Sequence, residues 1–205
     1  ITPLIFSDTT LLHCFGTCDT DGSCSPYPAQ MDLPISWDDA NTLYGVSGFG
    51  GCNVSVVTDP TDASNTVAQT IKTAGAQTWG GVILGASGLA NPIPFASGAT
   101  TMSARIWSST PGTPMRMKVE DATNGSVSVE TEVLSSVTND WEWITFDFSN
   151  QASGTAAIDF NNTYDKLVMF YNFGVVPSAD ETYYVDDIVF GNPPALGCNH
   201  TFNMY

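Results

Sequence analysis

The stretch YYVDDIVF at residues 183–190 has the composition of a packed β-strand, because six of its eight residues are aromatic or β-branched. Two adjacent carboxylates, Asp186 and Asp187, lie in its middle. Side chains alternate between the two faces of a strand, so a regular strand places Asp186 on the same face as Ile188 and Phe190. The sequence therefore predicts a carboxylate that faces the core of a β-sheet and needs a partner for its charge.

Short segments that alternate polar and apolar residues follow one another along most of the chain, separated by Gly, Pro, Asn and Asp. Ten such segments are found, at residues 33–37, 52–58, 65–73, 79–85, 100–108, 113–122, 126–134, 141–149, 165–174 and 182–191. This arrangement is typical of all-β proteins. We predict a two-sheet antiparallel β-sandwich, a jelly roll, over residues 31–191. An irregular N-terminal arm at 1–30 and a tail at 192–205 would flank it.

Composition excludes several classes of partner. The 205 residues are 42% hydrophobic, which is enough for a folded core, and carry 5 Lys+Arg against 21 Asp+Glu, a net charge of −16. Nucleic acid is an improbable partner because phosphate binding needs clustered basic residues. No apolar run is long enough to cross a bilayer, so we expect no membrane insertion.

Several features indicate a secreted or cell-surface protein. The chain starts at Ile1 without a Met, which we interpret as a mature form that has lost a signal peptide. N-glycosylation sequons occur at Asn53, Asn124, Asn161 and Asn199. Cysteines, which suit an oxidising compartment, occur at Cys14, Cys18, Cys24, Cys52 and Cys198.

The N-terminal arm contains three of these cysteines within eleven positions. Together with His13 they raise the possibility of a zinc site, but their spacing matches no C-x-x-C pair. Disulfides are favoured, and the sequence does not give their pairing. Five cysteines leave one over, either free or bridged to another chain.

Alternation separates two faces in the middle segments. Met115 and Met117 oppose Arg116 and Lys118 along residues 113–122. In the same way Ala104 and Ile106 oppose Arg105 and Trp107, and Val127, Val129 and Val133 oppose Glu130 and Glu132. We expect these polar residues to share one face, which in a jelly roll is often a concave groove.

Five segments carry a resemblance to a known family. They are PISWDDANTLYGVSGFGG, VVTDPTDASNTVAQTIKTAGAQTWGG, PMRMKVEDATNGSVSVETE, WEWITFDFSNQ and TYYVDDIVFG. They resemble galactose-binding-like β-jelly-roll carbohydrate-binding modules, which occur in secreted and cell-surface proteins, notably of marine bacteria. The resemblance covers roughly residues 33–191, and its most specific parts are the two Asp-Asp pairs of the first and last strands.

The resemblance implies that the first and last strands lie together. Asp38 and Asp39 would then approach Asp186, and a structural calcium ion would resolve the repulsion, because Ca²⁺ takes six to eight oxygen ligands. The alternative is that Asp187 is solvated and Asp186 accepts hydrogen bonds from backbone amides.

The resemblance also implies a non-catalytic module that binds a polysaccharide or other glycan. Sugars stack their C–H faces on aromatic rings and pair their hydroxyls with polar side chains. We expect the ligand-binding residues to be Trp107, Arg105, Arg116, Lys118, Glu130 and Trp79. No nucleophile elbow is present and both histidines lie in the arm and tail, so we predict no enzyme activity.

A second function stays open. The arm contains the apolar stretch TPLIFSDTTLL at residues 2–12, which would be an aggregation hazard if exposed. It either packs on its own domain or adds to a neighbouring subunit by strand donation. In the second case the protein is a homo-polymer, a self-assembling structural subunit of an extracellular glycoprotein fibre or coat.

Overall fold

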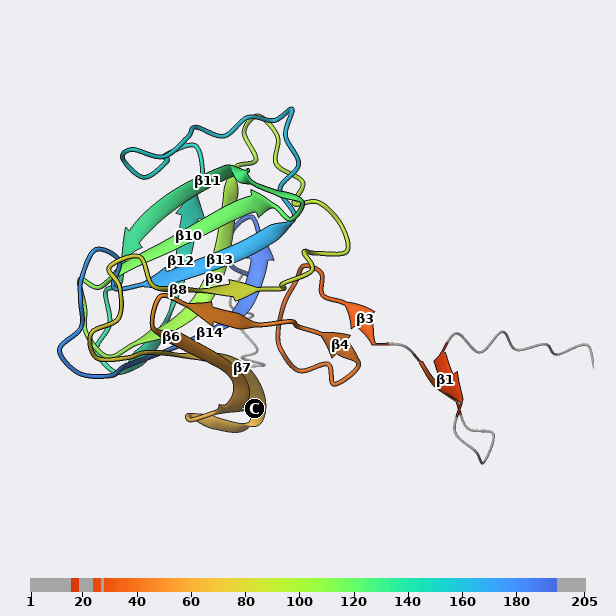
Figure 1. Ribbon diagram of the computed structural model, residues 1–205, viewed down its shortest axis with the longest axis horizontal. Helices are drawn as coiled ribbons and strands as arrows, with labels where there is room; N and C mark the ends of the chain where they lie inside the picture. The colour runs from red at the N-terminus through yellow and green to blue at the C-terminus, as the bar shows by residue number, and fades with distance from the viewer. Residues whose placement is uncertain (1–15, 19–23, 27, 195–205) are drawn as a thin grey trace, which may run out of the picture.

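The computed structural model describes residues 16–18, 24–26 and 28–194, and every regular element in them is a β-strand (Figure 1). The all-β class predicted from alternation is therefore confirmed. The strands are β1 (Gly16–Cys18), β2 (Cys24–Pro26), β3 (Ala29–Gln30), β4 (Thr42–Leu43), β5 (Ser47–Phe49), β6 (Cys52–Asp59), β7 (Asp62–Lys72), β8 (Gly81–Leu84), β9 (Thr101–Ser108), β10 (Pro114–Asp121), β11 (Asn124–Leu134), β12 (Asp140–Asp147), β13 (Lys166–Tyr171) and β14 (Glu181–Phe190).

Two five-stranded antiparallel sheets form the predicted sandwich. The front sheet, nearer the viewer in Figure 1, has the order β11-β10-β13-β8-β5. The back sheet has the order β12-β9-β14-β7-β6, so the strand with the paired carboxylates lies at its centre. Two further pairs, β1 with β2 and β3 with β4, are short two-stranded sheets.

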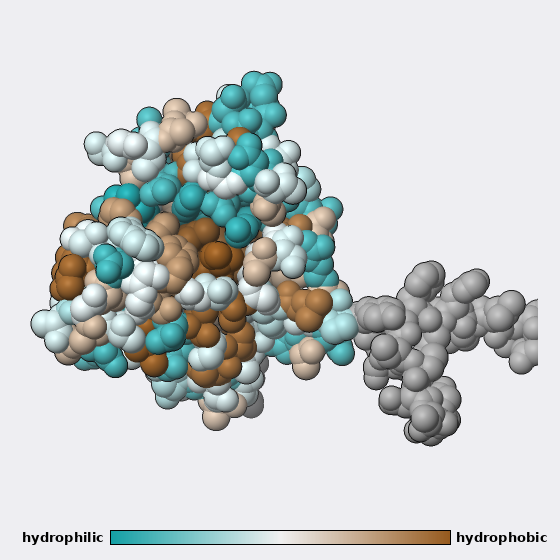
Figure 2. All heavy atoms as spheres, in the orientation of Figure 1, coloured by the Kyte–Doolittle hydropathy of each residue, from teal (hydrophilic) through white to brown (hydrophobic). Residues whose placement is uncertain are grey.

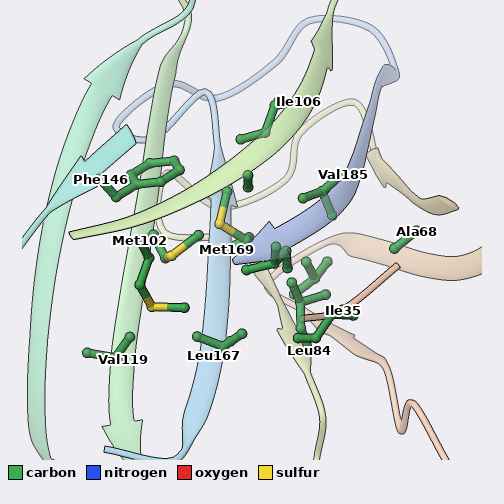
Figure 3. Close-up of a cluster of buried hydrophobic side chains, with 14 of the residues drawn as sticks. Ile35, Ala68, Leu84, Met102, Ile106, Val119, Phe146, Leu167, Met169 and Val185 are labelled. Atoms are coloured by element: carbon green, nitrogen blue, oxygen red, sulfur yellow. The ribbon is translucent and has the colours of Figure 1, made fainter. Parts of the chain in front are cut away.

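The core lies between the two sheets, where one face of each contributes apolar side chains (Figure 3). Met102 and Ile106 of β9 and Val185 of β14 enter it from the back sheet, all fully buried. Val119 of β10 and Met169 of β13 enter it from the front sheet. The period-two alternation of the sequence thus sets which side chains fill the sandwich.

The first and last segments of the sandwich meet, as the resemblance implied. Ile35 and Ile188 exchange two backbone hydrogen bonds, each of 2.9 Å. Both side chains are buried in the common core. This pairing joins the incoming chain to the central strand of the back sheet.

The predicted common polar face is wrong. β9 and β10 follow each other in the chain, but β9 pairs with β12 and β14 whereas β10 pairs with β11 and β13. Arg105 and Trp107 therefore lie on the outer side of the back sheet, and Arg116 and Lys118 on the outer side of the front sheet. Residues 109–113 carry the chain from one sheet to the other, so equal alternation in the two strands places their polar sides on opposite faces of the molecule.

The cysteine predictions have mixed outcomes. Cys52 is an unpaired, buried thiol and forms no disulfide, and the odd number of cysteines already required one to be left over. Its side chain points inward because Cys52 is paired in register with the fully buried Lys72. Cys18 and Cys24 are opposite each other in the β1–β2 pair. Cys14 and Cys198 lie outside the described residues, and the disulfides of the arm stay a prediction.

The sequons that can be located are accessible. Asn53, Asn124 and Asn161 are all exposed, which is a requirement for glycosylation, while Asn199 lies outside the described residues. Their occupancy stays a prediction.

We expect Phe146→Ala to lower the free energy of unfolding by about 3–5 kcal/mol, because it opens a cavity between the sheets. Phe146 is fully buried, whereas Leu134 at the end of β11 is 58% exposed, so Leu134→Ala is the matched control and should cost less than about 1 kcal/mol. Urea unfolding of both variants checks this. Equal losses would contradict the described core.

Candidate functional site

A β-bulge explains how the central strand holds a carboxylate. The pairing of β14 with β9 shifts register between Asp186 and Val189, and Asp187 has a left-handed backbone with φ of 48°. The bulge breaks the alternation, so Asp186 faces outward from the back sheet while Ile188 faces the core. The expectation that these two side chains share a face is wrong for this reason.

Arg105 supplies the counter-charge for the buried carboxylate. Asp186 is 1% exposed and is paired in register with Arg105 on β9. The Nη2 atom of Arg105 lies 2.7 Å from Asp186 Oδ2 and 3.4 Å from Asp59 Oδ2. Asn65 Nδ2 donates to the same Asp186 oxygen at 2.9 Å, and the amide of Asp187 donates to Oδ1 at 2.8 Å. Burial raises the pKa of Asp186, and the hydrogen bonds from Asn65 and Arg105 oppose this rise.

Aromatic rings pack around this ion pair. The guanidinium of Arg105 lies over the ring of Trp141, with Cζ 4.4 Å from the ring centroid. Trp107 packs edge-on against Tyr184, with 5.5 Å between the ring centroids. Trp141 packs against the same tyrosine, with 6.3 Å between the ring centroids. These contacts engage Trp107 and Arg105, both predicted ligand-binding residues, in stabilising the back sheet.

The three carboxylates proposed for calcium have other partners. Asp38 Oδ1 accepts hydrogen bonds from the amide and the hydroxyl of Thr66, at 3.0 and 2.7 Å. Asp39 Oδ1 accepts from the amide of Asn41 at 2.8 Å and so stabilises a turn. Within the described part of the chain, no three His, Cys, Asp or Glu residues are grouped so that they could hold a metal ion. Asp38, Asp39 and Asp186 each have hydrogen-bond partners within the protein, and calcium stays a prediction.

The outer face of the front sheet has a different character. Figure 2 shows it hollowed near its centre, with hydrophobic residues in the hollow and hydrophilic residues above it. Arg116 of β10 forms ion pairs with two glutamates of β11. Its Nη1 atom lies 3.1 Å from Glu130 Oε2, and its Nη2 atom lies 2.9 Å from Glu132 Oε2. Lys118 and Lys166 both pair with Glu120, at 2.7 and 2.9 Å. Three cations and three carboxylates thus balance one another on this face.

A row of aromatic rings runs along the same face. Trp79 is 52% exposed and stacks on Phe49, with 6.2 Å between ring centroids and 19° between ring planes. Phe49 contacts Phe170 edge-on at 5.9 Å, and Phe170 contacts Phe173 at 5.5 Å. We call these four residues the aromatic row.

The aromatic row and the charged pairs form one surface. The Cζ atom of Arg116 lies 3.5 Å from the ring centroid of Phe173, at the end of the row opposite Trp79. Gly81 of β8 makes room for the row, because a Cβ atom there would lie 2.6 Å from the ring of Phe170. The exposed ring of Trp79 and the ion pairs of Arg116 therefore lie at opposite ends of the aromatic row on the front face.

Four of the six predicted ligand-binding residues lie on this front face: Trp79, Arg116, Lys118 and Glu130. The other two, Trp107 and Arg105, lie on the back face. Sequence reasoning missed Phe49, Phe170 and Phe173. Phe170 could have been found from alternation, since Met169 beside it faces the core.

Comparisons with known proteins show which solved structures have a similar fold. No protein-family model matches the chain, and no curated protein is similar to it in sequence. Among solved structures, a Family 11 carbohydrate-binding module from a cellulosomal cellulase of Clostridium thermocellum matches 82% of this chain and 99% of its own, with 17% identity and a TM-score of 0.50. A Family 30 carbohydrate-binding module matches 83% of this chain and 92% of its own, with 14% identity and a TM-score of 0.49.

A third solved structure is a xylan-binding domain from Paenibacillus barcinonensis. It matches 81% of this chain and 99% of its own, with 17% identity and a TM-score of 0.45. The Family 11 module, at a TM-score of 0.50, is the structure among these three that shows the shared fold. At these identities the likeness concerns the fold alone.

We expect Arg105→Met to lower the free energy of unfolding by about 3–5 kcal/mol, because it leaves the buried Asp186 without a counter-charge. Adding Asp186→Asn to this variant should recover part of the loss, since it removes the uncompensated charge. Denaturant unfolding near neutral pH checks both expectations. If the losses in free energy of unfolding from Arg105→Met and Asp186→Asn simply add in the double variant, the pairing is contradicted.

Thermal unfolding of the wild type with calcium and with EDTA tests the calcium prediction, which requires a lower melting temperature in EDTA.

Acid should weaken the front-face ion pairs. Burial raises the pKa of Glu120, but hydrogen bonds and charge interactions with Lys118 and Lys166 lower it more, so the pKa lies below its usual 4.5. A lowered pKa in the folded state stabilises the protein above about pH 4.5, and this stability is lost as the pH falls through the folded-state value. Glu120→Gln should therefore show lower stability at neutral pH and a shallower loss in acid. Parallel stability curves for variant and wild type would contradict this.

Proposed function

We propose that this protein is a non-catalytic extracellular glycan-binding module and that its ligand lies along the front face. The observation that carries the proposal is the aromatic row, which leads from the exposed ring of Trp79 to the guanidinium of Arg116 on a hollowed sheet face. The likeness in fold to the Family 11 module supports it.

The chemistry of this face suits a sugar chain. Pyranose rings present flat C–H faces that stack on aromatic side chains, and Trp79 offers such a ring to solvent. Arg116, Glu130 and Glu132 supply donors and acceptors for hydroxyl groups beside the row. Because these groups already pair with one another, they are held in position before a ligand arrives.

Charge favours a neutral polysaccharide over an anionic one. All five basic residues lie in the described part of the chain, and Arg105, Arg116, Lys118 and Lys166 each pair with carboxylates. The fifth, Lys72, is fully buried and its Nζ donates to the carbonyl oxygens of Tyr171 and Asn172 at 3.0 and 2.8 Å. None of the five Lys and Arg side chains is left free for a sulfate or uronate, and the net charge of −16 repels both.

An extracellular setting completes the proposal. The sequons and cysteines favour it. Separately, the described residues contain no helix of the length and apolarity needed to cross a membrane. A structural subunit of an extracellular fibre or coat is the second candidate function, because the back sheet ends in an unprotected edge strand, β6.

We expect Trp79→Ala to weaken binding to a neutral polysaccharide by about tenfold or more, because a lost stacking contact costs about 1–2 kcal/mol. Trp107→Phe, on the opposite face, is the control and should bind as the wild type does. Affinity electrophoresis in gels containing neutral or sulfated polysaccharides measures both. If Trp107→Phe abolishes binding and Trp79→Ala does not, the site is on the back face. If the wild type binds no polysaccharide, the function is wrong.

A further inference from the structure

The outer strands of a sheet present unpaired backbone groups to solvent. The two five-stranded sheets have four outer strands, β11, β5, β12 and β6, and the first three are protected against pairing with another strand. The edge of β11 is covered, since the amide of Ala152 donates to Glu130 O at 2.7 Å and Thr131 Oγ1 donates to Asn150 O at 3.0 Å. β5 is only three residues long. β12 carries three carboxylates, those of Asp140, Glu142 and Asp147, which disfavour pairing with another strand.

β6 has none of these protections. Its sequence, CNVSVVTD at residues 52–59, contains no proline and no charge before the final Asp59. It pairs with β7 on one side, and no other described strand or loop makes a backbone hydrogen bond with residues 53–58. Val56 is 38% exposed. An eight-residue edge whose only charge is at its last position is a template for an added strand.

We infer that β6 accepts residues 4–12 of a second copy of this chain as a sixth strand of the back sheet. That segment, LIFSDTTLL, has five large apolar residues and two threonines, one charge and no proline, which is a composition suited to a strand. Main-chain hydrogen bonds to β6 would bind it, and its apolar side chains would lie against Val54 and Val56.

The course of the chain supports a second copy as the source. The strand β1, which follows this segment, lies beyond β3 and β4 and clear of the sandwich in Figure 1. β1 therefore does not lie against the back sheet of its own copy. Copies that each carry a net charge of −16 repel one another, so an uncharged strand is where they can approach most closely.

The predicted glycan at Asn53 is compatible with this contact. In register, Asn53 is opposite Ile71 and Ser55 is opposite Gln69, so Asn53 projects from the outer face of the sheet and not along its edge. Since donor and acceptor are different surfaces, the contact is head-to-tail and repeats from copy to copy as an open chain.

The full-length protein tests this by light scattering over a range of concentrations. The wild-type mass should rise with concentration. Val56→Lys should raise the concentration needed for assembly by about tenfold or more, because it places a charge on the edge. Val176→Lys makes the same change at a 56% exposed valine outside β6 and should assemble as the wild type does. A wild type that stays monomeric, or equal behaviour of the two variants, overturns the inference.

A mixing experiment identifies the donor. Phe6→Lys damages the donor segment and leaves β6 intact, whereas Val56→Lys damages β6 and leaves the donor intact. At a concentration where the wild type just assembles, each variant alone should stay monomeric, and an equimolar mixture should form dimers and nothing larger, because only one working contact is available per pair. If the mixture stays monomeric while the wild type assembles, a different contact is responsible and the inference falls.

Discussion

The ion pair between Asp186 and Arg105 is the interaction on which the back sheet depends. It joins the central strand β14 to β9, and Asp59 and Asn65 extend the network to β6 and β7. A carboxylate that is 1% exposed is costly unless a partner compensates it, so these strands can pack only if the guanidinium is in place. Trp141 stacks on the guanidinium of Arg105, whose side chain stays 27% exposed. The same strand, one bulge later, closes the sandwich through Ile35 and Ile188.

Alternation in the sequence was enough to predict the strands and the core but not the assignment of strands to sheets. Period-two patterns show which side chains share a face of one strand, and they are the same whether the next strand pairs with it or crosses to the other sheet. This is why Trp107 and Arg116 seemed to belong together. The bulge at Asp187 could not be predicted from the sequence for a related reason. One residue with a left-handed backbone reverses the alternation of side chains, and no residue type in the sequence marks it. The counter-charge of Asp186 lies 81 residues earlier in the chain.

The candidate site was predicted in part because its residues are of unusual types for their surroundings. Basic residues are few in this acidic chain, so Arg116 and Lys118 stood out, and Trp79 stood out as a tryptophan between glycines and polar residues. Phe49 and Phe170 did not, because phenylalanine in a strand is normally core. Only the pairing of β5, β8 and β13 brings these rings into one row beneath Trp79.

The two proposed surfaces are independent, and this has a physical consequence. The aromatic row lies on the outer face of the front sheet, and β6 is the edge of the back sheet, so occupation of one leaves the other free. A single shallow face with one exposed tryptophan supports modest affinity, because little ligand surface is enclosed. Copies joined through β6 would present many such faces along one chain, and a polysaccharide bound by one copy would meet the next at high effective concentration. Assembly would therefore strengthen glycan binding without any new contact to the sugar.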